Sequence, residues 1–221
     1  MKKAHFRYNG KNIQIPDTEN KKAIFLISIG QSYHESKYLS ATINLINKAN
    51  FNSCTIALAD VLQRHNYSLT HPQDVALQIA IENGHTWRDR NSNILNMLNT
   101  KNEIVSWDTW LKHPLYPSFR KEIDDTYYTN PCYKNAVNNT ADIFLSRFSK
   151  RESNIKQNFD QSLCLEYIKE ECAIIMPLWA HLDYDFIIYP KPMTSAMENT
   201  HEIFLKEKPH QMHWLSLHFK S

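Results

Sequence analysis

The chain has 221 residues, of which 42% are hydrophobic and 22% are charged. This length suits one domain with a large buried core, and the composition is ordinary for a soluble globular protein. A formal net charge of +2 does not demand a polyanionic partner, although the 25 Lys and Arg residues can still gather on one face.

Three classes of protein are disfavoured by what the sequence lacks. Charged residues at the amino terminus are not followed by the apolar run of a signal peptide, and no apolar run is long enough to span a bilayer, so a cytoplasmic location is expected. The four cysteines form no C-x-x-C pair, which argues against a zinc knuckle or a thioredoxin-type motif. With only three glycines, the chain cannot build the glycine-rich loop of a conventional nucleotide site.

The first half of the chain predicts an arm followed by alternating strands and helices. Residues 1–22 are polar, contain an Asn-Gly turn, and are expected to form an amino-terminal arm or short hairpin. The core begins with the apolar run Ala23 to Ile27, which is typical of a strand buried on both faces. The elements expected next are a helix over 35–50, a strand over 54–60, and a long helix from 72 to about 99 that Gly84 could interrupt.

The second half continues the alternation. The expected elements are a short strand over 103–107, helices over 116–148 broken at Asn130-Pro131, a helix over 155–179, a strand over 185–190, a helix over 195–205, and a last strand over 213–219. This alternation predicts an α/β fold with a mainly parallel sheet and helices on both faces, formed by a single domain over 23–221.

Ser28 lies where the first core strand leaves the sheet. The carboxyl ends of parallel strands are where ligands bind in open α/β sheets, so a hydroxyl in this place could be a nucleophile. Serine at a strand end is more often a turn former or a helix cap. This stretch alone therefore leaves both interpretations open.

Three more residues carry chemistry that could serve the same crevice. Tyr167 and Glu171 are spaced i, i+4, which places a phenol and a carboxylate on one face of a helix. Tyr189 ends a predicted strand, so in a parallel sheet it would point into the crevice beside Ser28. Taken singly, each is also typical of a core tyrosine or a solvated glutamate.

Taken together and in order, these residues resemble a known family. The run from Ile27 to Tyr33, the Tyr167-x-x-x-Glu171 helix and the Tyr189-Pro190 pair look like three signatures of the tRNA-dependent cyclodipeptide synthases. The run from Leu58 to His65 is similar to that family's second strand and the loop after it. The matches extend from about residue 23 to 190, and the ordered set is more specific than any single motif.

The resemblance implies a fold and an activity. The fold would be a Rossmann-like domain similar to the catalytic domain of class I tyrosyl- and tryptophanyl-tRNA synthetases, without ATP or another cofactor. The activity would be that of an aminoacyltransferase that takes two aminoacyl-tRNAs and releases a cyclic dipeptide, a diketopiperazine, by a ping-pong route through an aminoacyl enzyme. Gln31 at the family's variable position and the Tyr189-Pro190 pair imply the subfamily with a non-asparagine residue and a Tyr-Pro pair there.

The resemblance also implies roles for individual residues. Ser28 would receive the first aminoacyl group, and Tyr189 would hydrogen-bond its hydroxyl. Tyr167 and Glu171 would hold the α-ammonium group, and Gln31 would orient a carbonyl. The residues expected near the bound aminoacyl group are Ile24, Leu26, Ile187 and Pro190; Leu26 stands where some relatives have glycine, which would favour a smaller substrate side chain.

A tRNA partner requires cations that contact phosphates. The candidates are Arg88 and Arg90 on the long helix together with Lys101, with a second group formed by Arg147, Lys150, Arg151 and Lys156. A solvated helix face explains any one of them equally well.

Other interpretations remain open at this point. A serine hydrolase would need G-x-S-x-G, and the residues around Ser28 supply only the second glycine. A non-catalytic tRNA-binding protein with the same fold would not require all four of the candidate catalytic residues. The spacing of His210, His213 and His218 favours surface histidines over a metal site, so no metal is expected, nor is a membrane partner, and the protein is expected to be a monomer.

Overall fold

The computed structural model describes residues 2–8, 11–12, 18–151, 161–207 and 211–220. Its described strands form one seven-stranded sheet in the order β2-β1-β7-β6-β3-β4-β5. Their bounds are β1 Lys3–Tyr8, β2 Lys11–Asn12, β3 Lys22–Ser28, β4 Ser53–Ala59, β5 Lys101–Ser106, β6 Phe186–Tyr189 and β7 His213–Lys220.

The helices connect these strands. Their bounds are α1 Ser36–Ala49, α2 Arg64–Tyr67, α3 Gln73–Leu95, α4 Trp107–Leu111, α5 Tyr116–Thr129, α6 Pro131–Arg151, α7 Gln161–Ala173, α8 Trp179–His181 and α9 Ser195–Phe204. The described part of the chain also contains two 3₁₀ turns and one π-helical turn. They are η1 Ser32–His34, η2 Val61–Gln63 and η3 Ile174–Leu178, of which η3 is the π-helical turn.

Five neighbouring strands, from β5 through β7, run parallel, as the alternation of strands and helices predicts. Of the two forms expected for residues 1–22, an arm or a short hairpin, the structure shows the hairpin. Strand β1 pairs antiparallel with β7 over five residue pairs and forms a hairpin with β2, so this polar segment extends the sheet. Its lack of a continuous apolar run fits a position near the edge of the sheet, where only part of each strand is buried.

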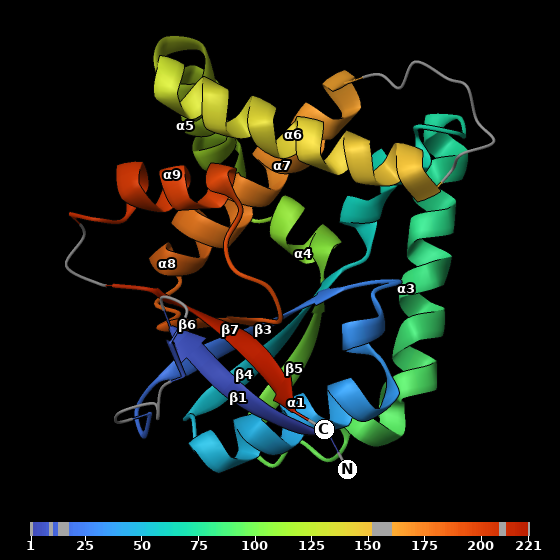
Figure 1. The fold of residues 1–221 in the computed structure, drawn as a ribbon, viewed down its shortest axis with the longest axis vertical. Helices are drawn as coiled ribbons and strands as arrows, with labels where there is room; N and C mark the ends of the chain where they lie inside the picture. Colours follow the sequence, from blue (N-terminus) through green and yellow to red (C-terminus); the bar gives the residue numbers. More distant parts are fainter. Residues whose placement is uncertain (1, 9–10, 13–17, 152–160, 208–210, 221) are drawn as a thin grey trace.

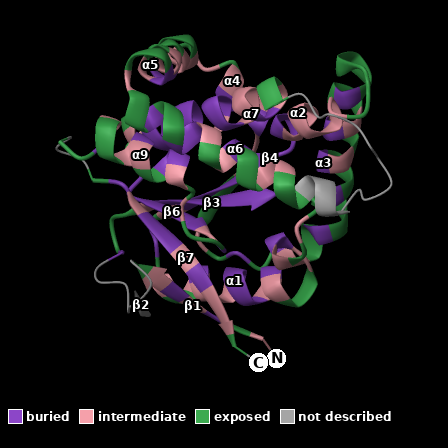
Figure 2. Ribbon diagram, turned by 45° about the horizontal axis from the view of Figure 1, so that its top comes forward, coloured by how far each residue is buried: buried purple, intermediate pink, exposed green. Residues whose placement is uncertain are grey.

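Helices cover both faces of the sheet, as expected for an α/β fold. In Figure 1, α1 lies below the sheet and α4 to α9 lie above it, while α3 rises along one side. Two apolar cores fill the two interfaces, one built around α1 and the end of α3 and the other around α4 to α9. Figure 2 shows that β3 is buried between them, whereas exposed residues cover much of α3 and α5.

The long helix α3 is continuous, although its single glycine could have interrupted it. Gly84 is buried, and a Cβ atom added there would lie 2.6 Å from the Cβ atom of Asp60. Asp60 in turn uses Oδ1 to accept hydrogen bonds from the main-chain N–H groups of Val61, at 2.8 Å, and Trp107, at 2.9 Å. The glycine therefore allows α3 to approach the carboxyl ends of β4 and β5.

The helix expected over 155–179 loses its regular α-helical form before its expected end. Its first residues lie outside the described part of the chain, and regular α7 ends at Ala173. A π-helical turn containing Pro177 follows. Proline has no N–H to donate and its ring clashes with the carbonyl four residues earlier, which explains why the regular hydrogen-bond ladder stops there.

Alternation along β3 decides which residues face the helices above the sheet. Ala23, Phe25 and Ile27 point into the core around α1. Ile24 and Leu26 point into the core around α7, and Ser28 continues their row. The strand therefore delivers the Ser28 side chain to the crevice between the sheet and α7.

Candidate active site

Three hydroxyl groups form a row at the carboxyl ends of β3 and β6. The Oγ atom of Ser28 lies 3.0 Å from the Oη atom of Tyr189, and that atom lies 2.9 Å from the Oη atom of Tyr33. Both distances are those of hydrogen bonds. Ser28 and Tyr189, which are 161 residues apart in sequence, are thus brought together as the sequence predicts.

His34 packs against this row of hydroxyl-bearing residues. It was not among the predicted site residues. It is fully buried, and its Nδ1 atom accepts a hydrogen bond of 3.0 Å from the main-chain N–H of Ser28. Its ring packs at an angle against the rings of Tyr33 and Tyr189. Burial lowers the pKa of His34 to about 3, so the ring is neutral at physiological pH, and its Nδ1 atom contacts the main chain of Ser28.

The same Nδ1 atom also lies 3.2 Å from the main-chain carbonyl oxygen of Ser28, so His34 contacts both main-chain polar groups of the serine. The signal for His34 in the sequence is only its place six residues after the serine. The turn Gln31 to His34, including a hydrogen bond from the main-chain N–H of His34 to the carbonyl of Gln31, folds the ring back under the strand end.

Tyr167 and Glu171 line the crevice from α7, on one face of that helix. Glu171 lies close enough to both tyrosines to raise the pKa of the Tyr167 and Tyr189 phenols, after the larger effect of burial. Both phenols therefore stay protonated at neutral pH, and neither is a phenolate base. The crevice thus collects Ser28, Tyr189, Tyr167 and Glu171, all four residues that the sequence marks as candidate catalytic groups.

The carboxyl group of Glu171 is in an unusual state. Burial, and to a lesser extent the negative charge of Glu170, raise its pKa to about 8. An incoming ammonium group would offset the cost of burying a carboxylate, and so would favour the charged form. The chemistry of this site suits an amine ligand.

The neighbouring Glu170 is held by a separate set of donors. Its carboxylate forms a two-pronged ion pair with Arg64 and accepts hydrogen bonds from His65, at 3.1 Å, and from the indole of Trp107, at 3.0 Å. These donors keep the pKa of Glu170 below its usual value despite its burial. The cluster joins the segment after β4 to α7, beside the site.

The remaining predicted site residues take different positions. Ile24, Leu26 and Ile187, with exposed fractions of 0, 1 and 1%, are buried in the core on the side of the sheet that α7 covers. Pro190 is also buried, directly after Tyr189. Gln31 is partly exposed in the turn after Ser28, where its main-chain N–H reaches the carbonyl of Ser28 at 3.4 Å.

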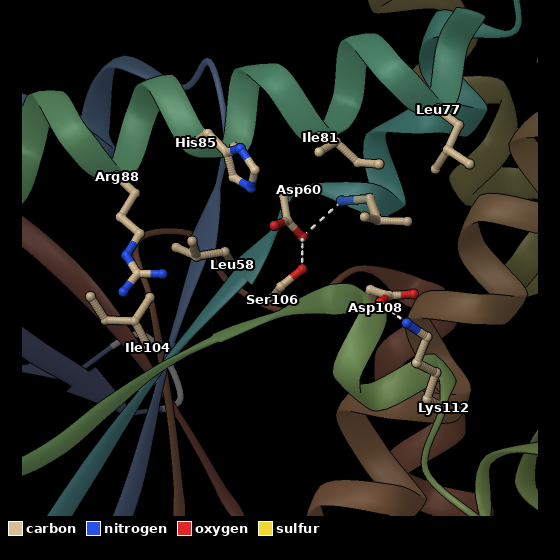
Figure 3. A pocket seen from close by; sticks show the side chains of 12 residues that line it. Leu58, Asp60, Leu77, Ile81, His85, Arg88, Ile104, Ser106, Asp108 and Lys112 are labelled. Carbon is tan, nitrogen blue, oxygen red and sulfur yellow. Dashed lines mark hydrogen bonds and ion pairs between the residues drawn. The ribbon is translucent and has the colours of Figure 1, made fainter. Parts of the chain in front are cut away.

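A second cavity of about 410 Å³ lies between α3 and α4, at the ends of β4 and β5. Figure 3 shows Leu77, Ile81, His85 and Arg88 reaching into it from α3, with Asp60 and Ser106 at its base. None of the four candidate catalytic residues lines this cavity. Val61, in the turn after β4, lines this cavity.

The predicted tRNA-binding cations do not form one cluster. Arg88 is exposed at the cavity, whereas Arg90 forms an ion pair of 2.5 Å with Glu35. Lys101 begins β5 and pairs with Ser53, at the opposite ends of the strands from Ser28. Of the second group, Lys156 lies outside the described residues, as does His210 of the histidine set.

Comparison with known proteins adds an independent finding. No family profile and no curated protein matches the sequence. Among solved structures, a cyclodipeptide synthase from Fluoribacter dumoffii is 32% identical, with a TM-score of 0.89 and a match that covers 100% of both chains. This chain belongs to the cyclodipeptide synthase family. As a member of that family, it is an aminoacyltransferase.

Two more distant cyclodipeptide synthases share the fold. The enzyme from Candidatus Glomeribacter gigasporarum, solved bound to Phe-tRNAPhe, is 18% identical, with a TM-score of 0.74 over 91% of this chain and 89% of that chain. The enzyme from Bacillus thermoamylovorans is 15% identical, with a TM-score of 0.69 over 92% and 90%. In the described part of this chain, no helix has the length and apolar character needed to cross a membrane.

Proposed function

We propose that this cyclodipeptide synthase joins the aminoacyl groups of two aminoacyl-tRNAs through an aminoacyl ester on Ser28. The observation that supports the proposal is the hydrogen bond between the hydroxyl groups of Ser28 and Tyr189, at the carboxyl ends of β3 and β6. An aminoacyl-tRNA is already an activated ester, so its transfer to serine requires no nucleotide.

In the first step, the Oγ atom of Ser28 attacks the ester carbonyl of the first substrate. The bond from the carbonyl carbon to the ribose oxygen breaks, and the proton of Ser28 ends on that ribose oxygen. Glu171 and Tyr167 hold the α-ammonium group, for which a carboxylate and a phenol oxygen are apt partners. Tyr189 orients the attacking hydroxyl.

In the second step, the α-amine of the second aminoacyl-tRNA attacks the carbonyl of the seryl ester. The bond from that carbonyl carbon to the Oγ atom of Ser28 breaks, a proton of the amine returns to this oxygen, and the dipeptide remains esterified to the second tRNA. In the last step, the free amine of the dipeptide attacks its own ester carbonyl, the bond to the ribose oxygen breaks, a proton of the amine ends on that oxygen, and the cyclic dipeptide and the tRNA leave. The protein's main contribution is alignment of two amines and two carbonyls, which can in principle supply about 7 to 11 kcal/mol.

We further propose that the chain belongs to the subfamily with a Tyr-Pro pair, because Tyr189 and Pro190 stand at the end of β6 and Gln31 occupies the variable position. In this proposal Ile24, Leu26 and Ile187 contact the first aminoacyl side chain from below. The solved complex of the Candidatus Glomeribacter gigasporarum enzyme with Phe-tRNAPhe supports a tRNA substrate.

The proposal predicts a product and an intermediate. Bacteria that express the chain should release cyclic dipeptides that mass spectrometry detects in the medium, and the protein incubated with labelled aminoacyl-tRNA should carry the label on Ser28. The Ser28→Ala variant should give neither. Ser32→Ala, which removes an exposed hydroxyl from the same turn, should retain both.

Two outcomes would contradict the proposal. Release of free amino acids without a cyclic dipeptide would indicate a serine hydrolase. Binding of tRNA with no covalent intermediate and no product, for every aminoacyl-tRNA tried, would indicate a non-catalytic tRNA-binding protein.

A further inference from the structure

Tyr33 stands at the far end of the hydroxyl row and has no role in the mechanism given so far. Its Oη atom lies 2.9 Å from that of Tyr189, and its ring packs edge-on against Tyr189 and His34. The Nζ atom of Lys191 lies 5.5 Å from the centre of the ring. Tyr33 is therefore held in place on several sides, with its oxygen aimed at Tyr189.

We propose that Tyr33 is a positioning residue that sets the direction of the hydrogen bond between Ser28 and Tyr189. The inference rests on the proposed function, in which Ser28 is the nucleophile. It concerns which hydroxyl group is the donor in each hydrogen bond of the row, because the positions of the oxygen atoms do not specify the donors.

Each hydroxyl has one hydrogen to donate and lone pairs to accept with. The Oη atom of Tyr189 lies between two hydroxyl oxygens, at 3.0 and 2.9 Å. When Tyr189 donates its hydrogen to Tyr33, it can accept the hydrogen of Ser28. The lone pairs of Ser28 are then free to face an ester carbonyl.

The reverse order would be unproductive. If Tyr189 donated to Ser28, one lone pair of the nucleophile would be engaged, and the serine hydrogen would point away from the row. Without the Tyr33 oxygen, Tyr189 would have Ser28 as its partner in the row and would adopt this order.

The test is the rate at which Ser28 is acylated in a single turnover, measured by rapid quench with labelled aminoacyl-tRNA. Tyr33→Phe removes only the oxygen and keeps the ring contacts. The acylation rate should fall about tenfold, the loss expected for one hydrogen bond. The substrate concentration that gives half of the maximal rate should not change, since Tyr33 is not proposed to bind substrate.

A double-mutant cycle tests whether Tyr33 acts on the acylation rate through Tyr189 or independently of it. If Tyr33 acts through Tyr189, the variant with both tyrosines changed to Phe should be no slower than Tyr189→Phe alone. Tyr38→Phe is the matched control, because its ring packs against Phe219 outside the crevice, and it should acylate at the normal rate. Placing 3-fluorotyrosine at position 33 restores a hydroxyl and should restore most of the rate, which also guards against a folding defect.

Three results would overturn the inference. Tyr33→Phe could acylate at the unchanged rate, the losses of the two single variants could simply multiply in the double variant, or 3-fluorotyrosine could fail to restore the rate. If the unaltered chain formed no ester on Ser28, the proposed function would fail and this role of Tyr33 with it. The same assay therefore distinguishes the two failures.

Discussion

At the scale of single residues, the side chains of the two adjacent glutamates of α7 have pKa values shifted in opposite directions. Glu170 is surrounded by donors, and its pKa is lowered; Glu171 faces the crevice, and burial raises its pKa to about 8. An unpaired buried carboxyl group costs stability, and such cost is typical of functional sites. The sequence Lys169-Glu170-Glu171 gives no sign of this difference, because the donors to Glu170 come from a distant segment.

Glu171→Gln should therefore make the protein more stable at neutral and basic pH. A glutamate titrates near pH 4.3 in the unfolded chain, and the fold favours its protonated form up to about pH 8. Stability is thus full below pH 4 and is lost as the pH rises to 8, by on the order of 4 kcal/mol. Urea unfolding should show a difference between variant and unaltered chain that grows over this pH range.

Glu166→Gln, on the same helix, is the control with the opposite sign. Salt bridges to Arg120 and Lys169 outweigh its partial burial and lower the pKa of Glu166, so this carboxylate stabilises the fold above its normal pKa. Replacement by Gln should reduce stability at neutral pH. A pH-independent effect of Glu171→Gln would contradict the raised pKa of Glu171.

At the scale of elements, the segment from Asp60 to Tyr67 connects three parts of the molecule. Asp60 caps the turns after β4 and β5, and Arg64 and His65 hold Glu170 on α7. This arrangement depends on the close approach of α3, which Gly84 permits. The sequence predicts the strands and the helix, but the contact between them depends on how the helix packs.

Gly84→Ala should destabilise the protein, although alanine favours helix formation by about 1 kcal/mol over glycine. The new Cβ atom would lie 2.6 Å from Asp60, and such overpacking typically costs about 1–3 kcal/mol. Urea unfolding measures the loss. Thr86→Ala, at an exposed position of the same helix, should be neutral or slightly stabilising; a Gly84→Ala variant as stable as that control would show that Asp60 moves away without cost.

At the scale of the whole molecule, the parallel sheet separates two ends with different roles. The crevice lies at the carboxyl ends of the strands, and Arg88 is exposed near that side at the second cavity. Lys101 lies at the amino end of β5, which is about 20 Å from the carboxyl end of that strand at the usual rise per residue. We propose that the tRNA approaches over α3, with Arg88 in contact with a phosphate.

Arg88→Ala should weaken binding of aminoacyl-tRNA and reduce by about one the slope of log affinity against log salt concentration. Arg90→Ala should have a smaller effect, because its charge is already paired with Glu35. Lys101→Ala tests whether the tRNA also reaches the opposite end. Fluorescence titration at several salt concentrations measures all three, and unchanged binding by Arg88→Ala would exclude the approach over α3.

The sequence by itself determined the fold class and the candidate catalytic groups. Apolar runs and helical spacing are local properties, so they predicted the strands and helices, and the ordered motifs marked Ser28, Tyr167, Glu171 and Tyr189. Alternation along β3 puts Ser28 on the same face as Ile24 and Leu26, and the structure shows that α7 covers this face. The short hairpin expected within residues 1–22 is present as β1 and β2, but its pairing with β7 was not predicted, because that contact depends on a strand at the other end of the chain.

The tertiary structure alone decided how these groups behave. The neutral His34 beneath Ser28, the contact of Tyr33 with Tyr189 and the raised pKa of Glu171 all depend on burial and on partners that the fold supplies. Hydrogen bonds and desolvation act over a few ångströms in space, whatever the separation in sequence. A linear pattern can therefore name a reactive group, but its protonation and orientation are set only when the chain folds.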